Sequence, residues 1–143
     1  MLENPDAGFD AGLWAKIGAQ GWCGAAIPEE YGGLEFGYVE LCALAEELGR
    51  AVAPVPFASS IYQFAEALLR AGSEAQKREI LPHIASGGLI GTLAFSEGPG
   101  VLPAQRITTR FRNGALHGTK IPVTDGCAAH PQWCWRKAPK GPA

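Results

Sequence analysis

Apolar residues recur every three or four positions through the first half of the chain, a spacing typical of amphipathic helices. This pattern predicts helices over residues 10–20, 36–50 and 57–71, with Asp10 placed to cap the first of them. Their apolar faces are formed by Leu13, Trp14 and Ile17, by Tyr38, Leu41, Ala45 and Leu48, and by Ile61, Phe64, Ala65 and Leu68.

A fourth helix is predicted from a capping box at Ser73-Glu74-Ala75-Gln76, because serine and glutamine at this spacing exchange hydrogen bonds with the backbone. We expect this helix to extend to about Ile80. Pro82 lacks an amide proton and is expected to interrupt it, with another turn of helix as an option over residues 82–86.

After Gly87-Gly88 the pattern becomes typical of strands, which are predicted over residues 90–95, 106–111 and 115–124. Asn113-Gly114 predicts a hairpin turn between the last two. Helices followed by strands indicate an α+β fold. We expect an all-α helical domain over residues 1–88 and an incomplete antiparallel β domain over residues 89–126.

Composition indicates a globular protein and removes several classes of function. Of the 143 residues, 47% are hydrophobic, and the net charge of -2 gives no basis for binding nucleic acid or an anionic membrane. No apolar run is long enough to span a bilayer, and the acidic first ten residues do not read as a secretory leader. Cys23 and Cys42 lie in apolar helical surroundings and are expected to be reduced, buried thiols, so we expect a cytoplasmic protein.

One segment fits no regular element. Ile27-Pro28-Glu29-Glu30-Tyr31-Gly32-Gly33 combines a fixed proline φ with two glycines and predicts a tight loop between helices. With the motifs that follow it, this loop resembles the N-terminal part of the acyl-CoA dehydrogenases over about residues 9–126. Those motifs are, in order, Gly72-Ser73-Glu74-Ala75-Gln76-Lys77, Leu81-Pro82, Ala85-Ser86-Gly87 and Ser96-Glu97.

The resemblance implies an oxidoreductase that removes two hydrogens from the α and β carbons of an acyl-CoA thioester, with FAD as cofactor. It also implies a homo- or hetero-oligomer of dehydrogenase subunits. The glutamate base of the family lies in a C-terminal helical domain, beyond the residues matched here. We therefore expect a fragment that is inactive alone, and we assign it no catalytic residue and no metal.

The resemblance assigns flavin contacts to two strand ends. The run Leu93-Ala94-Phe95-Ser96-Glu97-Gly98 matches the end of the family's first β strand, where a Thr-Glu-Pro motif contacts the flavin ring. Ser96 keeps the hydroxyl donor of that motif, and Gly98 replaces its proline. After Gly118-Thr119-Lys120, Thr124 keeps a hydroxyl and Pro122 replaces an aromatic residue. The expected cofactor-binding residues are Phe95, Ser96 and Thr124. The alternative interpretation is that these are ordinary strand-end side chains.

Two other functions remain open. The chain is also consistent with a non-catalytic subunit that completes a flavin site with a full-length dehydrogenase. A helical interaction module with no flavin role is the second alternative. Detection of flavin absorbance after coexpression with dehydrogenase subunits would separate the two.

Residues 127–143 differ from everything before them, since they hold two of the four cysteines, two of the four tryptophans and no acid. We expect this tail to be disordered. A shifted reading frame explains it: read from the third base of each codon, Gln132-Trp133-Cys134-Trp135 encodes valine or methionine, then valine, then leucine. Resequencing the gene tests this hypothesis. Cys127, His130 and Cys134 are a weak candidate for zinc because their spacing is irregular.

Overall fold

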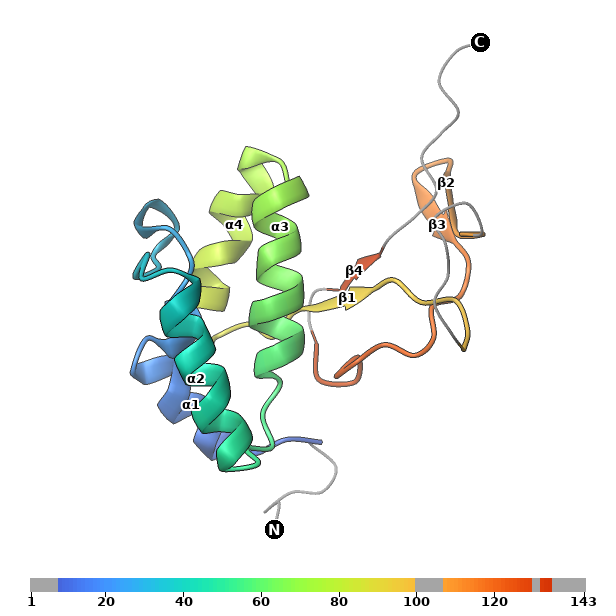
Figure 1. Cartoon of the computed structure of the whole chain (residues 1–143). Helices are drawn as coiled ribbons and strands as arrows, with labels where there is room; N and C mark the ends of the chain where they lie inside the picture. The colour runs from blue at the N-terminus through green and yellow to red at the C-terminus, as the bar shows by residue number, and fades with distance from the viewer. Residues whose placement is uncertain (1–7, 100–106, 130–131, 135–143) are drawn as a thin grey trace.

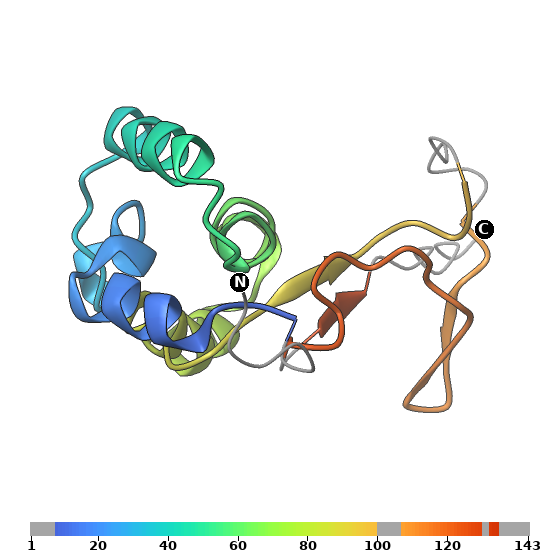
Figure 2. The same ribbon diagram turned by 90° about the horizontal axis from the view of Figure 1, so that it is seen from below.

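The computed structural model describes residues 8–99, 107–129 and 132–134. The helices of the described part form one unit, and short strands extend away from it (Figure 1). Viewed from below, the helices are arranged as an open ring, and β1 leaves from one side of it (Figure 2). The predicted α+β fold, with helices first and strands afterwards, is confirmed.

Helix α1 (Ala11–Ala19) begins directly after its predicted cap. The Asp10 carboxylate accepts a hydrogen bond of 2.8 Å from the Leu13 amide. Trp14 and Ile17 are buried, as their spacing predicts. The Trp14 indole donates to the Gly87 carbonyl at 2.9 Å, which joins α1 to the segment that leads into the strands.

The predicted tight loop contains a single turn of 3₁₀-helix, η3 (Glu29–Tyr31), and a second such turn, η2 (Trp22–Gly24), precedes it. Gly32 has a φ of 80°, a value that favours glycine. The Tyr31 ring is buried, and its hydroxyl donates to the Glu74 carboxylate at 3.1 Å. The loop is therefore packed against the start of the fourth α-helix.

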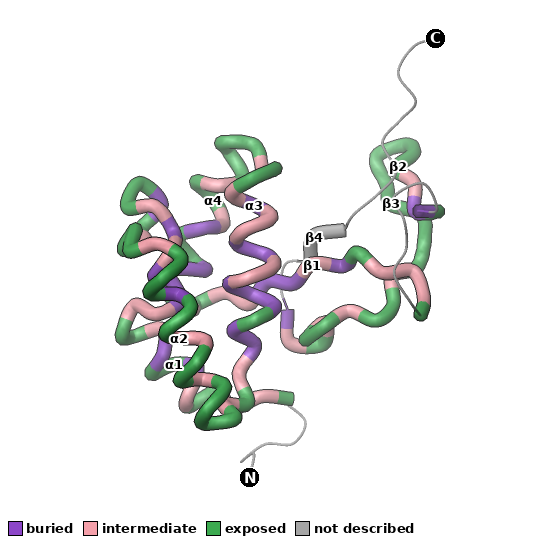
Figure 3. Tube along the Cα trace, in the orientation of Figure 1, coloured by how far each residue is buried: buried purple, intermediate pink, exposed green. Residues whose placement is uncertain are grey.

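Helix α2 (Tyr38–Arg50) is the most exposed of the four α-helices in the described part, as its largely green trace shows (Figure 3). Leu41 is its buried residue, while Ala45 and Leu48 are half-buried and Tyr38 is exposed. The predicted apolar face is therefore only partly covered. The predicted pair on its surface forms, with Arg50 Nη2 2.9 Å from Glu46 Oε1.

The third predicted helix forms as two joined pieces. A π-helix, η4 (Ala58–Ala65), continues directly into α3 (Glu66–Ala71). All the apolar residues predicted for its core face are buried, namely Ile61, Phe64, Ala65 and Leu68. The wider turn was not predicted, because the same apolar spacing also fits an ordinary α-helix.

Helix α4 (Glu74–Ala85) has the predicted capping box at its start, with Ser73 N and Gln76 N both bonded to side chains. The prediction that Pro82 interrupts this helix is wrong. Leu81 and Ile84 are fully buried on either side of the proline and hold the last turn in place. The Pro82 carbonyl still accepts from the Ser86 amide at 3.2 Å.

The capping box predicts a measurable contribution to stability. We expect Ser73→Ala to lower the free energy of unfolding by about 1 kcal/mol, because the Gln76 amide loses its side-chain acceptor. Urea unfolding followed by circular dichroism measures this. Ser73→Asp, which keeps an acceptor at the cap, is the control and should remain within about 0.5 kcal/mol of the unaltered chain. Equal losses in both variants would contradict a capping role.

The strands are shorter than predicted. They are β1 (Thr92–Ala94), β2 (Arg110–Arg112), β3 (Ala115–His117) and β4 (Gln132–Cys134). Strands β2 and β3 form the predicted antiparallel hairpin, with positive φ at Asn113 and Gly114. Strand β1 pairs in parallel with β4, an arrangement that the sequence did not indicate.

The structure describes only part of the tail, residues 127–129 and 132–134. The disorder expected for the tail and the expected domain limits stay predictions. Gln132–Cys134 lies beside β1, and Ala129 is buried. His130 of the weak zinc candidate lies outside the described residues. Among the residues that are described, no group of three metal-ligating side chains comes together. Within the same ranges, no helix has both the length and the apolar character needed to cross a bilayer.

Candidate functional site

The two segments predicted to contact flavin lie side by side. The Ile121 amide donates to the Ser96 carbonyl at 2.9 Å, and the Gly98 amide donates to the Ile121 carbonyl at 2.9 Å. These bonds form a short parallel bridge between Glu97 and Ile121. Residues that are more than twenty positions apart therefore share one edge of the β segment.

Thr124 is held to the same region from two directions. Thr92 Oγ1 donates to the Thr124 carbonyl at 2.6 Å. The neighbouring Asp125 carboxylate accepts from the Ser59 hydroxyl at 2.6 Å, and Ser59 is buried in the π-helix η4. The Thr124 side chain is exposed beside Thr92, the first residue of β1.

Glu97 lies at the centre of a polar cluster on this edge. Its carboxylate accepts from the amides of Thr108 and Thr109, at 2.7 and 2.9 Å, and from both of their hydroxyls. Lys120 Nζ lies 3.0 Å from the same carboxylate, and the two side chains are only 7% and 6% exposed. These hydrogen bonds, those from the threonine hydroxyls first, hold the pKa of Glu97 well below its usual range.

This lowered pKa predicts how the cluster responds to acid. A carboxyl whose pKa falls on folding stabilises the folded state above its unfolded pKa of about 4.3 and loses that contribution as the pH drops toward the folded pKa. We expect the Thr108 and Thr109 amide resonances to stay unchanged from pH 7 to about 4.3 and to shift only below it. A nuclear magnetic resonance titration measures this, and a transition centred above pH 5 would contradict it.

The residues of this edge fit an uncharged flavin ring. Phe95 is 46% exposed and offers an aromatic face, while Ser96 and Thr124 offer neutral hydroxyls. Lys120 compensates the charge of Glu97, so the pair adds no net charge beside the ring position. The donor set therefore suits a conjugated ring with polar atoms along its rim.

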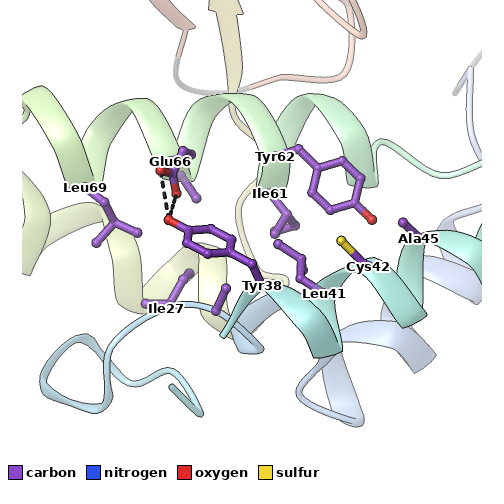
Figure 4. A pocket seen from close by; sticks show the side chains of 11 residues that line it. Ile27, Tyr38, Leu41, Cys42, Ala45, Ile61, Tyr62, Glu66 and Leu69 are labelled. Carbon is purple, nitrogen blue, oxygen red and sulfur yellow. Dashed lines mark hydrogen bonds between the residues drawn. The ribbon is translucent and has the colours of Figure 1, made fainter. Parts of the chain in front are cut away.

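A separate apolar pocket of about 330 Å³ lies between α2 and the joined helices η4 and α3 (Figure 4). Tyr38 reaches across one end of it, and its hydroxyl donates to both Glu66 oxygens at 3.0 and 3.1 Å. The pocket is lined by Ala26, Ile27, Tyr38, Leu41, Cys42, Ala45, Ile61, Tyr62, Ala65, Glu66 and Leu69.

This pocket offers apolar volume and little chemistry. Its carboxylate, Glu66, is already bonded to Tyr38 and Arg70. The Tyr62 hydroxyl is buried without a hydrogen-bond partner among the described residues, and burial raises its pKa. None of the residues predicted to bind flavin lines the pocket. The β edge is therefore the better candidate for the functional site.

Sequence reasoning missed two central residues of that edge. Glu97 and Lys120 both stand inside the motifs that carried the family resemblance, yet neither was assigned a role. Their separation of 23 positions gives no local signal that they meet. The burial of these two charged side chains marks them as a pair, but burial can be recognised only after the hairpin between them has been placed.

Comparison with known proteins establishes the family. Residues 2–88 match the family model of the acyl-CoA dehydrogenase N-terminal domain. The chain therefore belongs to the acyl-CoA dehydrogenase family, and the resemblance found in its motifs is confirmed.

Individual relatives extend the match beyond the helical domain. The chain is 35% identical over 126 residues to mitochondrial isovaleryl-CoA dehydrogenase from Solanum tuberosum, an alignment that covers 84% of this chain and 31% of the relative. The chain thus spans about a third of the length of the curated relatives that it matches.

Solved structures give the same picture. A chain of the ChsE4-ChsE5 complex from Mycobacterium tuberculosis is 32% identical, with a TM-score of 0.74 over 87% of this chain and 34% of that one. Butyryl-CoA dehydrogenase from Megasphaera elsdenii shares the fold, with a TM-score of 0.76 at 24% identity, over 96% of this chain and 38% of that one.

Proposed function

We propose that this chain is the flavin-facing N-terminal part of an FAD-dependent acyl-CoA dehydrogenase and that it has no dehydrogenase activity alone. The observation that carries the proposal is the meeting of the Ser96–Gly98 and Lys120–Ile121 segments on one edge. Family membership supports FAD as the cofactor and an acyl-CoA as the substrate. FAD would accept the hydride that leaves the β carbon of that substrate.

Within this proposal, Phe95, Ser96 and Thr124 hold the flavin ring. Ser96 and Thr124 supply hydroxyl donors, and Phe95 excludes water from the ring by contact with its face. The carbonyls of Phe95, Ser96 and Thr124 accept hydrogen bonds from Lys120, Ile121 and Thr92, respectively, so little ordering is needed on binding.

The proposed lack of activity follows from the state of the two carboxylates near the proposed flavin contacts, Glu97 and Asp125. General base catalysis requires a carboxylate within hydrogen-bond reach of the proton that is removed. Glu97 is committed to Thr108, Thr109 and Lys120, with its pKa lowered, and Asp125 is bonded to Ser59. Neither carboxylate is available as that base.

Flavin binding and turnover test the two halves of this proposal separately. FAD is titrated into the full chain and followed by quenching of flavin fluorescence, with Ser96→Ala and Thr124→Ala expected to weaken binding at least several-fold. Thr119→Ala, an exposed neighbour in the same segment, is the matched control. Absence of FAD binding would contradict the flavin contacts. Reproducible oxidation of acyl-CoA with an artificial electron acceptor would contradict the proposed inactivity.

A second candidate function is that of a non-catalytic subunit that pairs with a full-length dehydrogenase. Such a subunit either completes a flavin site or acts as a helical interaction module with no flavin role. The side chains of Phe36, just before α2, and of Tyr38 and Val39, in its first turn, are exposed, which supports contact with a partner. Coexpression with full-length dehydrogenase subunits tests this. Copurification with flavin absorbance favours a shared flavin site, and copurification without it favours an interaction module.

We propose the cytoplasm as the location of the chain. Cys23 and Cys42 are free thiols; Cys23 is buried, but the predicted burial of Cys42 is wrong, because it lies on the exposed side of α2. Burial raises the pKa of Cys23 to about 12, so this thiol stays protonated and unreactive. Free thiols are consistent with a reducing compartment. Cell fractionation with an antibody against the chain tests the location.

A further inference from the structure

The Glu97 carboxylate closes the base of the β2–β3 hairpin. Thr108 and Thr109 lead into β2, and Lys120 follows β3. One oxygen of Glu97 accepts from the amide and hydroxyl of Thr108. The other accepts from the amide and hydroxyl of Thr109 and from Lys120. A single side chain therefore ties both legs of the hairpin together.

The hairpin is shaped so that this contact can form. Gly118 lies against Thr109, and a Cβ at Gly118 would come within 2.5 Å of Thr109 Oγ1. Its φ of 153° also disfavours other residues. The absence of a side chain at Gly118 thus lets the Thr109 hydroxyl turn toward Glu97.

The same cluster determines where the proposed flavin contacts lie. Lys120 Nζ donates to the Phe95 carbonyl at 3.1 Å as well as to Glu97. The next residue, Ile121, is bonded to Ser96 and Gly98. The hydrogen-bond partners of the Phe95, Ser96 and Gly98 backbone are therefore Lys120 itself or the residue that follows it.

We infer that Glu97, paired with Lys120, is the positioning residue of the flavin edge. It anchors the end of β1 to the base of the β2–β3 hairpin and so fixes Phe95 and Ser96 in their binding geometry. The flavin part of this inference rests on the proposed function. Glu97 itself touches neither substrate nor cofactor in this role.

A positioning role differs from a general contribution to stability. The helical unit has its own core, formed by residues such as Trp14, Phe64 and Leu81. Loss of Glu97 should therefore release the strand end and the hairpin while the helices remain folded. A residue that only stabilises the whole chain would affect both parts equally.

Amide hydrogen exchange on the full chain tests the anchor directly. Glu97→Gln and Lys120→Met are compared with Thr119→Val, a matched control that alters an exposed side chain next to Lys120. We expect the first two variants to raise exchange at the Gly98, Thr108, Thr109 and Ile121 amides at least tenfold. Exchange in α1 and α4 should change less than twofold, and the control should match the unaltered chain.

FAD titration of the same proteins supplies the second readout. We expect the FAD dissociation constant to rise at least tenfold in Glu97→Gln and in Lys120→Met, with a change in the visible absorbance bands of the bound flavin. Unchanged exchange at the four amides, or an equal rise in the helices, would overturn the inference. Increased exchange at those amides with unchanged FAD affinity and spectrum would also overturn it.

The two proposals fail in different ways. If the unaltered chain binds no FAD, the flavin contacts of the proposed function are wrong, and with them the flavin part of this inference. The exchange measurement still decides whether Glu97 anchors the strand end, because it requires no ligand.

Discussion

Gly33→Ala is expected to destabilise the chain by about 3 kcal/mol or more, among the largest losses available from adding a single methyl group. A Cβ at Gly33 would lie 1.9 Å from the Ile27 carbonyl oxygen and 2.6 Å from the Ile27 Cβ. That carbonyl cannot move freely, because it accepts from the Glu35 amide at 3.0 Å and belongs to a buried residue. The glycine pair of the family loop is therefore required for space as well as for backbone conformation.

Gly49→Ala is the matched control for this prediction. A Cβ at Gly49 has no neighbour within 4 Å, and the residue lies inside α2. We expect this substitution to stabilise the chain by up to about 1 kcal/mol, because alanine favours a helix more than glycine does. Urea unfolding monitored by tryptophan fluorescence measures both variants. A loss below about 1 kcal/mol for Gly33→Ala would show that the loop relaxes around the added methyl group.

The helices could be predicted from the sequence because their signals are local. The apolar spacing of Leu13, Trp14 and Ile17 and the caps at Asp10 and Ser73 act within a few residues of each helix. Pro82 misled the prediction because its local effect is outweighed by burial of Leu81 and Ile84, which depends on the rest of the fold.

The arrangement of the strands depends on partners that are distant in the chain. The Asn113-Gly114 turn predicted the β2–β3 hairpin, since its two strands are neighbours in sequence. Nothing in the apolar pattern indicated that β1 pairs in parallel with β4, forty positions further on. Strand length followed the pairing rather than the pattern, which is why all the predicted strands were too long.

In the candidate site, too, local motifs could be predicted and contacts between distant residues could not. Motif order led to Phe95, Ser96 and Thr124, and their role in binding flavin stays a prediction. The bonds that bring their segments together, between Ile121 and Ser96 and between Thr92 and Thr124, span 25 or more positions. The buried charges of Glu97 and Lys120 became interpretable only once those bonds were known, because burial of a charged group depends on tertiary structure.

Phe64→Ala is expected to lower the free energy of unfolding by about 3–5 kcal/mol. Phe64 is 2% exposed in η4 and belongs to the main core. Its ring packs directly on the Gly91 backbone just before β1, since a Cβ at Gly91 would lie 2.1 Å from Phe64 Cδ1. Phe36→Ala is the control: Phe36 is 59% exposed, and its loss should change stability by no more than about 0.5 kcal/mol.

The contact between Phe64 and Gly91 also predicts strong coupling between the two positions. Gly91→Ala alone should be severely destabilising, because the added methyl group overlaps the Phe64 ring. In the Phe64→Ala background the same methyl group enters the space left by the ring, so most of its cost should disappear. A double-mutant cycle by urea unfolding should therefore give a coupling free energy of about 2 kcal/mol or more. Additive losses would mean that the helical unit and β1 do not meet through this ring.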